Sequence, residues 1–125
     1  MIKTLAAAAL IAVLGACASL VGAPMPAKFE GGMLVDSAGM TLYTFDRDTA
    51  GSGKSACNGP CIALWPALKA ADTDRPAGDW SIVTRDDGSR QWAYKSKPLY
   101  LWVKDQKPGD KTGDGVNKVW HIIAQ

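Results

Sequence analysis

Side chains on which many enzymes depend are scarce in this sequence. Its 125 residues include one histidine, His121, and one glutamate, Glu30. No Gly-x-Ser-x-Gly elbow and no phosphate-binding glycine loop occurs. A single histidine restricts catalytic triads, and paired-carboxylate hydrolysis would rest on aspartates that show no marked pairing. We therefore expect a protein that is not an enzyme.

The sequence also lacks a transmembrane segment and a strong excess of charge. The apolar run Leu5–Val13 is far shorter than the ~20 residues that span a bilayer. The formal net charge is +2, and no basic patch or run indicates a nucleic-acid partner. Once residues 1–16 are set aside, the remainder is close to neutral and long enough for one small domain.

The first residues have the pattern of an export signal. Lys3 precedes the run Leu5–Val13 and small residues follow it, which is the order of a secretory signal peptide. The segment Leu14–Cys17 (LGAC) resembles the bacterial lipobox, in which the cysteine is lipidated and becomes the new N-terminus. This resemblance implies a lipoprotein signal peptide over residues 1–16. It also implies an exported protein, anchored in a membrane through Cys17 and facing the periplasm or the cell exterior.

Small residues and prolines fill the next stretch. Residues 17–28 therefore predict a flexible, lipidated tether between the membrane and the folded part. The domain is then expected over residues 29–125. Ordinary signal cleavage after the small-residue triplet at 16–18 is the alternative to lipidation.

An internal repeat occupies the expected domain. The segments LYTFDRD (Leu42–Asp48) and LYLWVKD (Leu99–Asp105) match in register at a spacing of 57 residues. A leucine, a tyrosine, a second aromatic residue and an aspartate recur: Leu42/Leu99, Tyr43/Tyr100, Phe45/Trp102 and Asp48/Asp105. Four matches in a window of seven residues indicate duplication.

A tryptophan follows each of these segments, Trp65 in the first case and Trp120 in the second. Duplication predicts two related units, at about 30–70 and 80–123. We expect the units to pack together, because neither buries enough apolar area alone.

Short apolar and β-branched stretches between turn residues predict a mainly β, antiparallel domain. The expected strands are 32–35, 40–45, 81–84, 91–94, 98–103 and 119–123. One short helix is expected over Asn58–Trp65, because Pro60 suits a first helical turn and Pro66 ends the helix.

The repeated aromatic residues share one face of their strands. Alternation places Tyr43 and Phe45 on one face and Leu42 on the other, and it places Tyr100 and Trp102 together. We expect these rings to belong to the core. A platform that stacks on a sugar or a quinone is the alternative.

The repeated motif resembles the one that defines a family of bacterial secreted-repeat lipoproteins, Tyr-x-(Phe/Trp/Tyr)-x-x-Asp. The cysteine–tryptophan block 57–66 and the glycine-rich segment 108–120 are also similar to this family, and the resemblance covers about Glu30–Ile123. It implies export and residence in the cell envelope, with no assigned activity and no catalytic residue. The motif residues are Tyr43, Phe45, Asp48, Tyr100, Trp102 and Asp105. Both aspartates open a loop, and we expect them to accept hydrogen bonds from turn amides.

Cys57 and Cys61 allow three interpretations. In an exported protein an even pair is most simply a disulfide, which is the interpretation we favour. With His121, two thiolates form a ligand set that suits copper or zinc. A working redox pair is the third, although this spacing is a weaker redox cue than Cys-x-x-Cys.

These patterns predict a membrane-anchored envelope lipoprotein that acts as a non-enzymatic binding or accessory module without a cofactor. The membrane is a partner through the lipid on Cys17, no nucleic acid is expected, and the ligand or protein partner is left unspecified. The alternative is an envelope metal-binding or electron-transfer protein that uses Cys57, Cys61 and His121 with copper or zinc.

Overall fold

The computed structural model of this chain describes residues 25–125. The predicted signal peptide of residues 1–16, the predicted lipidation site Cys17 and the predicted tether up to residue 24 lie outside the described residues. Within residues 25–125, none of the helices has the length and apolar character needed to cross a membrane.

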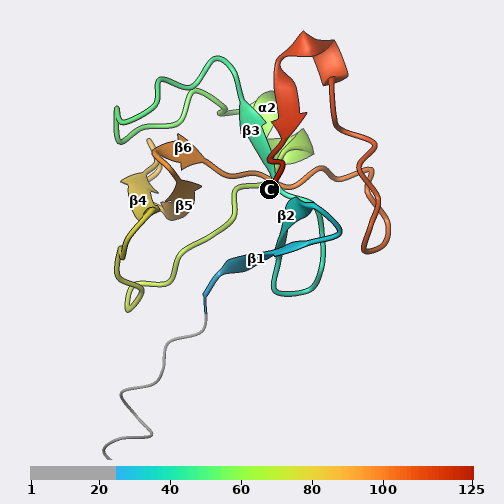
Figure 1. The fold of residues 1–125 in the computed structure, drawn as a ribbon. Helices are drawn as coiled ribbons and strands as arrows, with labels where there is room; N and C mark the ends of the chain where they lie inside the picture. Colours follow the sequence, from blue (N-terminus) through green and yellow to red (C-terminus); the bar gives the residue numbers. More distant parts are fainter. Residues whose placement is uncertain (1–24) are drawn as a thin grey trace, which may run out of the picture.

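Short antiparallel strands dominate the described part of the chain (Figure 1). They are β1 (Ala27–Glu30), β2 (Met33–Asp36), β3 (Tyr43–Phe45), β4 (Trp80–Thr84), β5 (Arg90–Tyr94), β6 (Lys97–Pro98) and β7 (Trp120–Ile122). Strand β1 pairs with β2, β3 pairs with β7, and β4, β5 and β6 form a three-stranded sheet. The α-helix α2 (Pro60–Leu64) and the 3-10 helix η1 (Val116–Lys118) complete the regular structure. The predicted class, a mainly antiparallel β domain with one short helix, is confirmed.

Tight turns join the hairpin strands. Gly31 and Gly32 connect β1 to β2 with φ angles of 63° and 84°, a left-handed conformation that glycine adopts without steric cost. Lys95 and Ser96 connect β5 to β6 with φ angles of 49° and 70°. Two consecutive positive φ angles match the right-handed twist of the flanking strands, which explains why such short loops suffice.

Several boundaries differ from the sequence prediction; β3, for example, covers only Tyr43–Phe45 of the expected strand 40–45. Strand β1 begins at Ala27, two residues before the expected start of the domain at Phe29. Helix α2 is shorter than predicted: it begins at Pro60, and Trp65 leaves it with ψ of 75°. This ψ lies outside the helical region, which the following Pro66 disfavours.

The predicted strand 98–103 is regular only at its start. Beyond β6 it passes from β5 to two new partners, the segment 66–68 on one edge and Tyr43 on the other. The Leu99 N–H donates to the Trp92 carbonyl, and the Leu101 N–H donates to the Pro66 carbonyl. Tyr100, between them, bridges to Tyr43. A continuous ladder needs one partner strand, so this stretch is extended without forming a long strand.

The two units exchange strands. Strand β3 of the first unit pairs with β7 of the second, with Tyr43 opposite Ile122 and Phe45 opposite Trp120. In the matching place, Tyr100 of the second unit bridges to Ala67 of the first. Each tyrosine segment therefore pairs with the segment that follows the tryptophan of the other unit, and the two units interlock.

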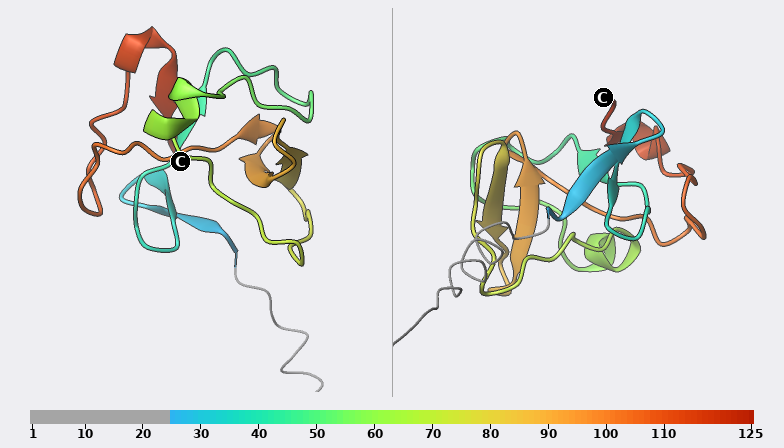
Figure 2. Two further views of the ribbon diagram at one scale, coloured as in Figure 1. Left: turned by 180° about the vertical axis from the view of Figure 1, so that it is seen from behind. Right: turned by 60° about the horizontal axis from the view of Figure 1, so that its bottom comes forward.

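Two apolar clusters lie on the two faces of the motif segments. Tyr43, Cys57, Trp65, Tyr100 and Trp120 form the first, and Ala27, Leu34, Leu42 and Leu99 form the second. The predicted alternation is thus confirmed, since the motif tyrosines and leucines point to different clusters. Figure 2 shows the β1–β2 hairpin and the β4–β5–β6 sheet on separate sides of the molecule.

Candidate functional site

The two motif tyrosines lie side by side at the centre of the molecule. Tyr43 and Tyr100 have no exposed surface, and they face each other as an antiparallel bridge. The N–H of Tyr43 donates to the carbonyl of Tyr100 at 2.9 Å, and the reverse bond measures 3.0 Å. The related units therefore meet at equivalent residues.

Each tyrosine hydroxyl binds the motif aspartate of the other unit. Tyr43 Oη donates to Asp105 Oδ2 at 2.6 Å, and Tyr100 Oη donates to Asp48 Oδ2 at 2.6 Å. Hydrogen bonds to an ionised carboxylate are shorter and about twice as strong as those between neutral groups. Two such bonds, made reciprocally, join the units at their buried centre.

The second carboxylate oxygen of each aspartate holds a loop. Asp48 Oδ1 accepts the Ala56 N–H at 2.6 Å. Asp105 Oδ1 accepts the Thr112 N–H at 3.0 Å and the Thr112 hydroxyl at 2.6 Å. The expected bonds from turn amides are thus present. They fasten the loops 48–56 and 105–112, which lie on opposite sides of the molecule in Figure 1.

Burial raises the pKa values of Tyr43, Tyr100 and Asp48. Desolvation raises the pKa of both Tyr43 and Tyr100 far above the usual value near 10, and the bonds to the aspartates raise it further. Burial also raises the pKa of Asp48, against the hydrogen bonds from Tyr100 and Ala56 that lower it. The phenols therefore stay protonated donors well into the alkaline range.

Four aromatic rings stack through the first cluster. Trp65 and Trp120 lie face to face, with ring centroids 3.8 Å apart and an angle of 3° between the planes. Trp102 covers the outer face of Trp65 at 3.9 Å, and Phe45 covers the outer face of Trp120 at 4.2 Å. The two motif aromatics thus close the two ends of the stack.

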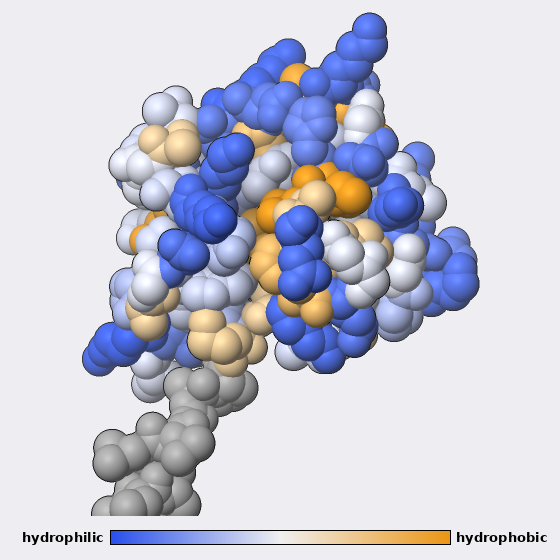
Figure 3. All heavy atoms as spheres, viewed as in Figure 1, coloured by the Kyte–Doolittle hydropathy of each residue, from blue (hydrophilic) through white to orange (hydrophobic). Residues whose placement is uncertain are grey.

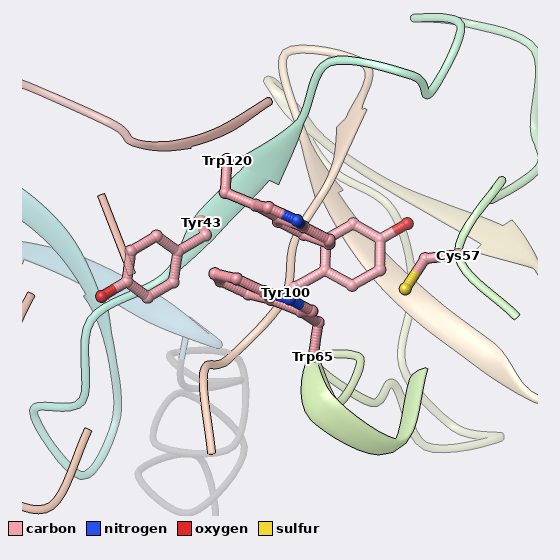
Figure 4. Packing of buried hydrophobic residues seen from close by; sticks show 5 residues of the cluster. All are labelled: Tyr43, Cys57, Trp65, Tyr100 and Trp120. Carbon is pink, nitrogen blue, oxygen red and sulfur yellow. The ribbon is translucent and has the colours of Figure 1, made fainter. Parts of the chain in front are cut away.

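The tyrosines meet the stacked indoles edge-on. Tyr43 contacts Trp65 at 5.3 Å and 81°, and Tyr100 contacts Trp120 at 5.2 Å and 87°. Figure 4 shows the indole pair with Tyr43 and Tyr100 on opposite sides of it. Edge-to-face contact places the positive ring edge against the negative ring face, which makes this geometry favourable. The prediction that the tyrosine rings belong to the core is therefore confirmed, since neither ring is exposed.

Gly113 allows a loop to approach the stack closely. A Cβ atom at this position would lie 2.8 Å from Trp65 and 3.0 Å from Trp102. The Gly113 N–H also donates to Tyr43 Oη at 3.1 Å. The glycine-rich segment before Trp120 was noted in the sequence, but only the structure shows which glycine touches the rings.

Cys57 and Cys61 form the expected disulfide, with 5.2 Å between their Cα atoms. Cys57 is completely buried and belongs to the aromatic cluster. The buried Arg85 donates to the Cys57 carbonyl, to Asn58 Oδ1 at 3.1 Å and to Gln91 Oε1 at 2.8 Å. This guanidinium fastens the disulfide loop to the β4–β5 hairpin.

The imidazole of His121 interacts with Asp46 and not with the disulfide. Its Nε2 is 2.7 Å from Asp46 Oδ2, across the β3–β7 pair. Within residues 25–125, no three side chains of His, Cys, Asp or Glu are grouped so that they could hold a metal ion. The structure therefore does not bring His121 together with Cys57 and Cys61.

A groove of about 520 Å³ runs beside β7, between the β3–β7 pair and the β5–β6 turn. Its apolar lining residues are Phe29, Tyr94, Ile122, Ile123 and Ala124, and its polar ones are Thr44, Asp46, Lys95, Lys97, His121 and Gln125. Figure 3 views the face that carries the C-terminal residues, where apolar side chains are bordered by hydrophilic ones. The groove is the concave surface in which apolar and charged groups converge most clearly.

Only some features of this groove can be predicted from the sequence. Alternation puts Thr44 and Asp46 on the face opposite Tyr43, where they line the groove. Lys95 and Lys97 lie between the expected strands 91–94 and 98–103, but no sequence signal sets this turn across from β7. The sequence alone therefore assigns none of these four residues to a site.

Comparison with known proteins gives one match. The profile of a family described as a secreted repeat of unknown function matches residues 28–69 and again residues 81–124. The two matched stretches correspond to the two related units. No curated protein and no solved structure matches the chain.

Removal of one buried phenol hydroxyl should weaken the fold. In Tyr43→Phe, Asp105 Oδ2 loses its donor and the Gly113 N–H loses its acceptor, so we expect the free energy of unfolding to fall by about 1–3 kcal/mol. Tyr100→Phe should cost a similar amount. Urea denaturation measures both. Tyr94→Phe is the matched control, since no hydrogen bond of its hydroxyl occurs within residues 25–125, and equal losses in all three variants would contradict the reciprocal bonds.

Alkali should destabilise the protein in proportion to its buried phenols. Because the pKa of Tyr43 and of Tyr100 is raised in the folded state, the unfolded chain loses these protons first as the pH rises. Their stabilising contribution is complete below about pH 10 and falls above it by up to about 1.4 kcal/mol per pH unit for each tyrosine. Urea midpoints measured across this range should show the slope, and Tyr100→Phe should roughly halve it. A stability that stays constant through this range would refute the assignment.

Proposed function

This chain belongs to the family of secreted repeats of unknown function, and we propose that it is an exported, non-enzymatic binding module of the cell envelope. The groove beside β7 is the observation that supports this function. We propose further that the module works without a cofactor and takes an amphipathic ligand with an anionic head group.

The floor of the groove suits an apolar group. The rings of Phe29 and Tyr94 meet edge-on at 6.0 Å, and the partly buried Ile122 and Ile123 lie beside them. Small-molecule sites are typically concave and apolar, with a few polar groups that orient the ligand. An aliphatic chain or a ring system would remove this surface from water at both partners.

The rim of the groove favours a negative head group. Lys95 and Lys97 are exposed, and within residues 25–125 neither forms a salt bridge. The one acidic side chain that lines the groove, that of Asp46, is engaged by His121 at 2.7 Å. The two ammonium groups therefore supply the available charge, which an anionic carboxylate or phosphate would complement.

A second hollow, of about 640 Å³, lies near Arg85 but offers a poorer site. The guanidinium there already donates to Gln91, Asn58 and Cys57. Asp86 and Asp87 line the same hollow beside Lys69, so the charges of its walls are mixed. The groove beside β7 combines apolar and cationic surface without this conflict.

We also propose that the module is held at a membrane by lipid on Cys17, which the lipobox-like sequence LGAC supports. Two or more acyl chains give stable anchoring, whereas one chain binds only marginally. The variant Cys17→Ala should move the protein from the membrane fraction to the soluble fraction, and it should no longer incorporate radiolabelled palmitate in cells. Membrane retention of Cys17→Ala would exclude this anchor.

The ligand class can be tested with a simple probe, decanoate, in isothermal titration calorimetry. We expect decanoate to bind and decanol, which lacks the charge, to bind at least tenfold more weakly. The double variant Lys95→Gln/Lys97→Gln should lose about tenfold in affinity, equal to about 1.4 kcal/mol. Lys111→Gln/Lys118→Gln removes the same charge outside the groove and should bind normally. Absence of binding, or equal binding by both double variants, would overturn the proposed site.

A further inference from the structure

The aromatic core connects the molecular surface to both buried tyrosines. From the half-buried Trp102, the next ring is Trp65 at 3.9 Å, and the next is Trp120 at 3.8 Å. Tyr43 touches Trp65 at 5.3 Å, and Tyr100 touches Trp120 at 5.2 Å. Indoles and phenols are the protein side chains that lose one electron most readily besides thiols. Rings in direct contact therefore link an accessible oxidisable group to two inaccessible ones.

Each tyrosine at the inner end has its own proton acceptor. Loss of one electron makes a phenol strongly acidic, so its proton must leave if a stable radical is to form. The Tyr43 hydroxyl already donates to Asp105, and the Tyr100 hydroxyl already donates to Asp48, both at 2.6 Å. Proton transfer then requires only a short movement along an existing hydrogen bond. The raised pKa of Asp48 adds to its basicity.

The stacked indoles suit a transient positive charge. Trp65 and Trp120 are each 3% exposed and almost parallel, so a cation formed on either ring is shared with the other and is shielded from water. Phe45 covers the far face of Trp120 at 4.2 Å. A benzene ring is much harder to oxidise than an indole, so the positive charge does not move from Trp120 to Phe45.

The charges near the stack direct a positive charge inward. The Lys104 ammonium lies 5.7 Å from the Trp102 ring centroid, so it opposes a cation at the entry ring. The carboxylates of the buried Asp105 and the half-buried Asp48 lie beyond the indoles and attract one. Both effects favour a positive charge at the inner end of the row of rings over a positive charge at Trp102.

We propose that the protein accepts an oxidising equivalent at Trp102 and carries it to Tyr43 and Tyr100, where it is held as a neutral tyrosyl radical. A one-electron oxidant, such as an oxidised metal centre or metal complex, takes an electron from the indole of Trp102. The missing electron is replaced in turn from Trp65 and Trp120, and finally from Tyr43 or Tyr100. The phenol O–H bond breaks, its proton forms an O–H bond with the aspartate carboxylate, and the oxidant is reduced by one electron. This activity is independent of the groove beside β7.

Flash photolysis tests the relay directly. Ruthenium(III) tris(bipyridine), generated by a laser flash with a cobalt(III) ammine as the final electron acceptor, is the oxidant. We expect transient absorption of a tryptophanyl radical to give way to that of a tyrosyl radical. A freeze-quenched sample should show the tyrosyl signal by electron paramagnetic resonance. A tryptophanyl radical that decays without a tyrosyl product would overturn the proposal.

Matched variants locate the path. Trp102→Phe should reduce the tyrosyl yield several-fold, because it removes the entry ring and keeps a ring of similar shape. Trp80→Phe and Tyr94→Phe alter the neighbouring aromatic pair in the second cluster, 4.9 Å apart, and should leave the yield unchanged. An undiminished yield in Trp102→Phe, or a lost signal in Tyr94→Phe, would place the radical outside this relay.

The inner end is tested by single substitutions, which keep one tyrosine–aspartate pair intact. Tyr43→Phe and Tyr100→Phe should each lower the tyrosyl yield about twofold. Near-ultraviolet circular dichroism confirms that each variant retains its packed aromatic core. In Asp48→Asn the acceptor of the Tyr100 proton is replaced by a neutral amide, so the rate of tyrosyl formation should fall although the rings remain in place. A tyrosyl yield and rate unaffected by all three changes would refute the assignment.

Discussion

The reciprocal hydrogen bonds between the motif tyrosines and aspartates hold this structure together. Tyr43 of the first unit binds Asp105 of the second, and Tyr100 of the second binds Asp48 of the first. A buried polar group costs free energy unless it is hydrogen-bonded, and each of the two fully buried tyrosine hydroxyls finds its carboxylate partner in the other unit. The units are consequently two halves of one core, and neither contains all of its own bonding partners.

This arrangement explains the spacing of the repeated motif. The tyrosine and the second aromatic residue are two positions apart, so they share one face of an extended segment and reach the same ring cluster. The aspartate lies three positions beyond, at the start of a loop, where one oxygen binds a turn amide and the other remains for the opposite tyrosine. One short motif, used twice, thus supplies the stack, the buried bonds and the anchorage of both loops.

Exchange of strands between the units also creates the surface features. Because β7 of the second unit pairs with β3 of the first, His121 comes to lie beside Asp46, and the apolar residues after Trp120 form the floor of a groove. The same exchange brings Trp65 and Trp120 face to face. Membership in a family of secreted repeats of unknown function is consistent with a fold in which the repeat itself is the structural unit.

The sequence by itself determined the features that depend on local order. Alternation assigned Tyr43 and Leu42 to different faces, proline positions indicated the short helix, and the two close cysteines in an exported chain indicated the disulfide. Only the tertiary structure decided which aspartate each tyrosine binds, since the partners are 52 and 62 residues apart. Strand periodicity is the same whether a tyrosine binds the aspartate of its own unit or that of the other unit, so the pattern does not distinguish the two. The crossing of the chain between the units selects the partner, and with it the groove, because those contacts depend on packing over the whole core.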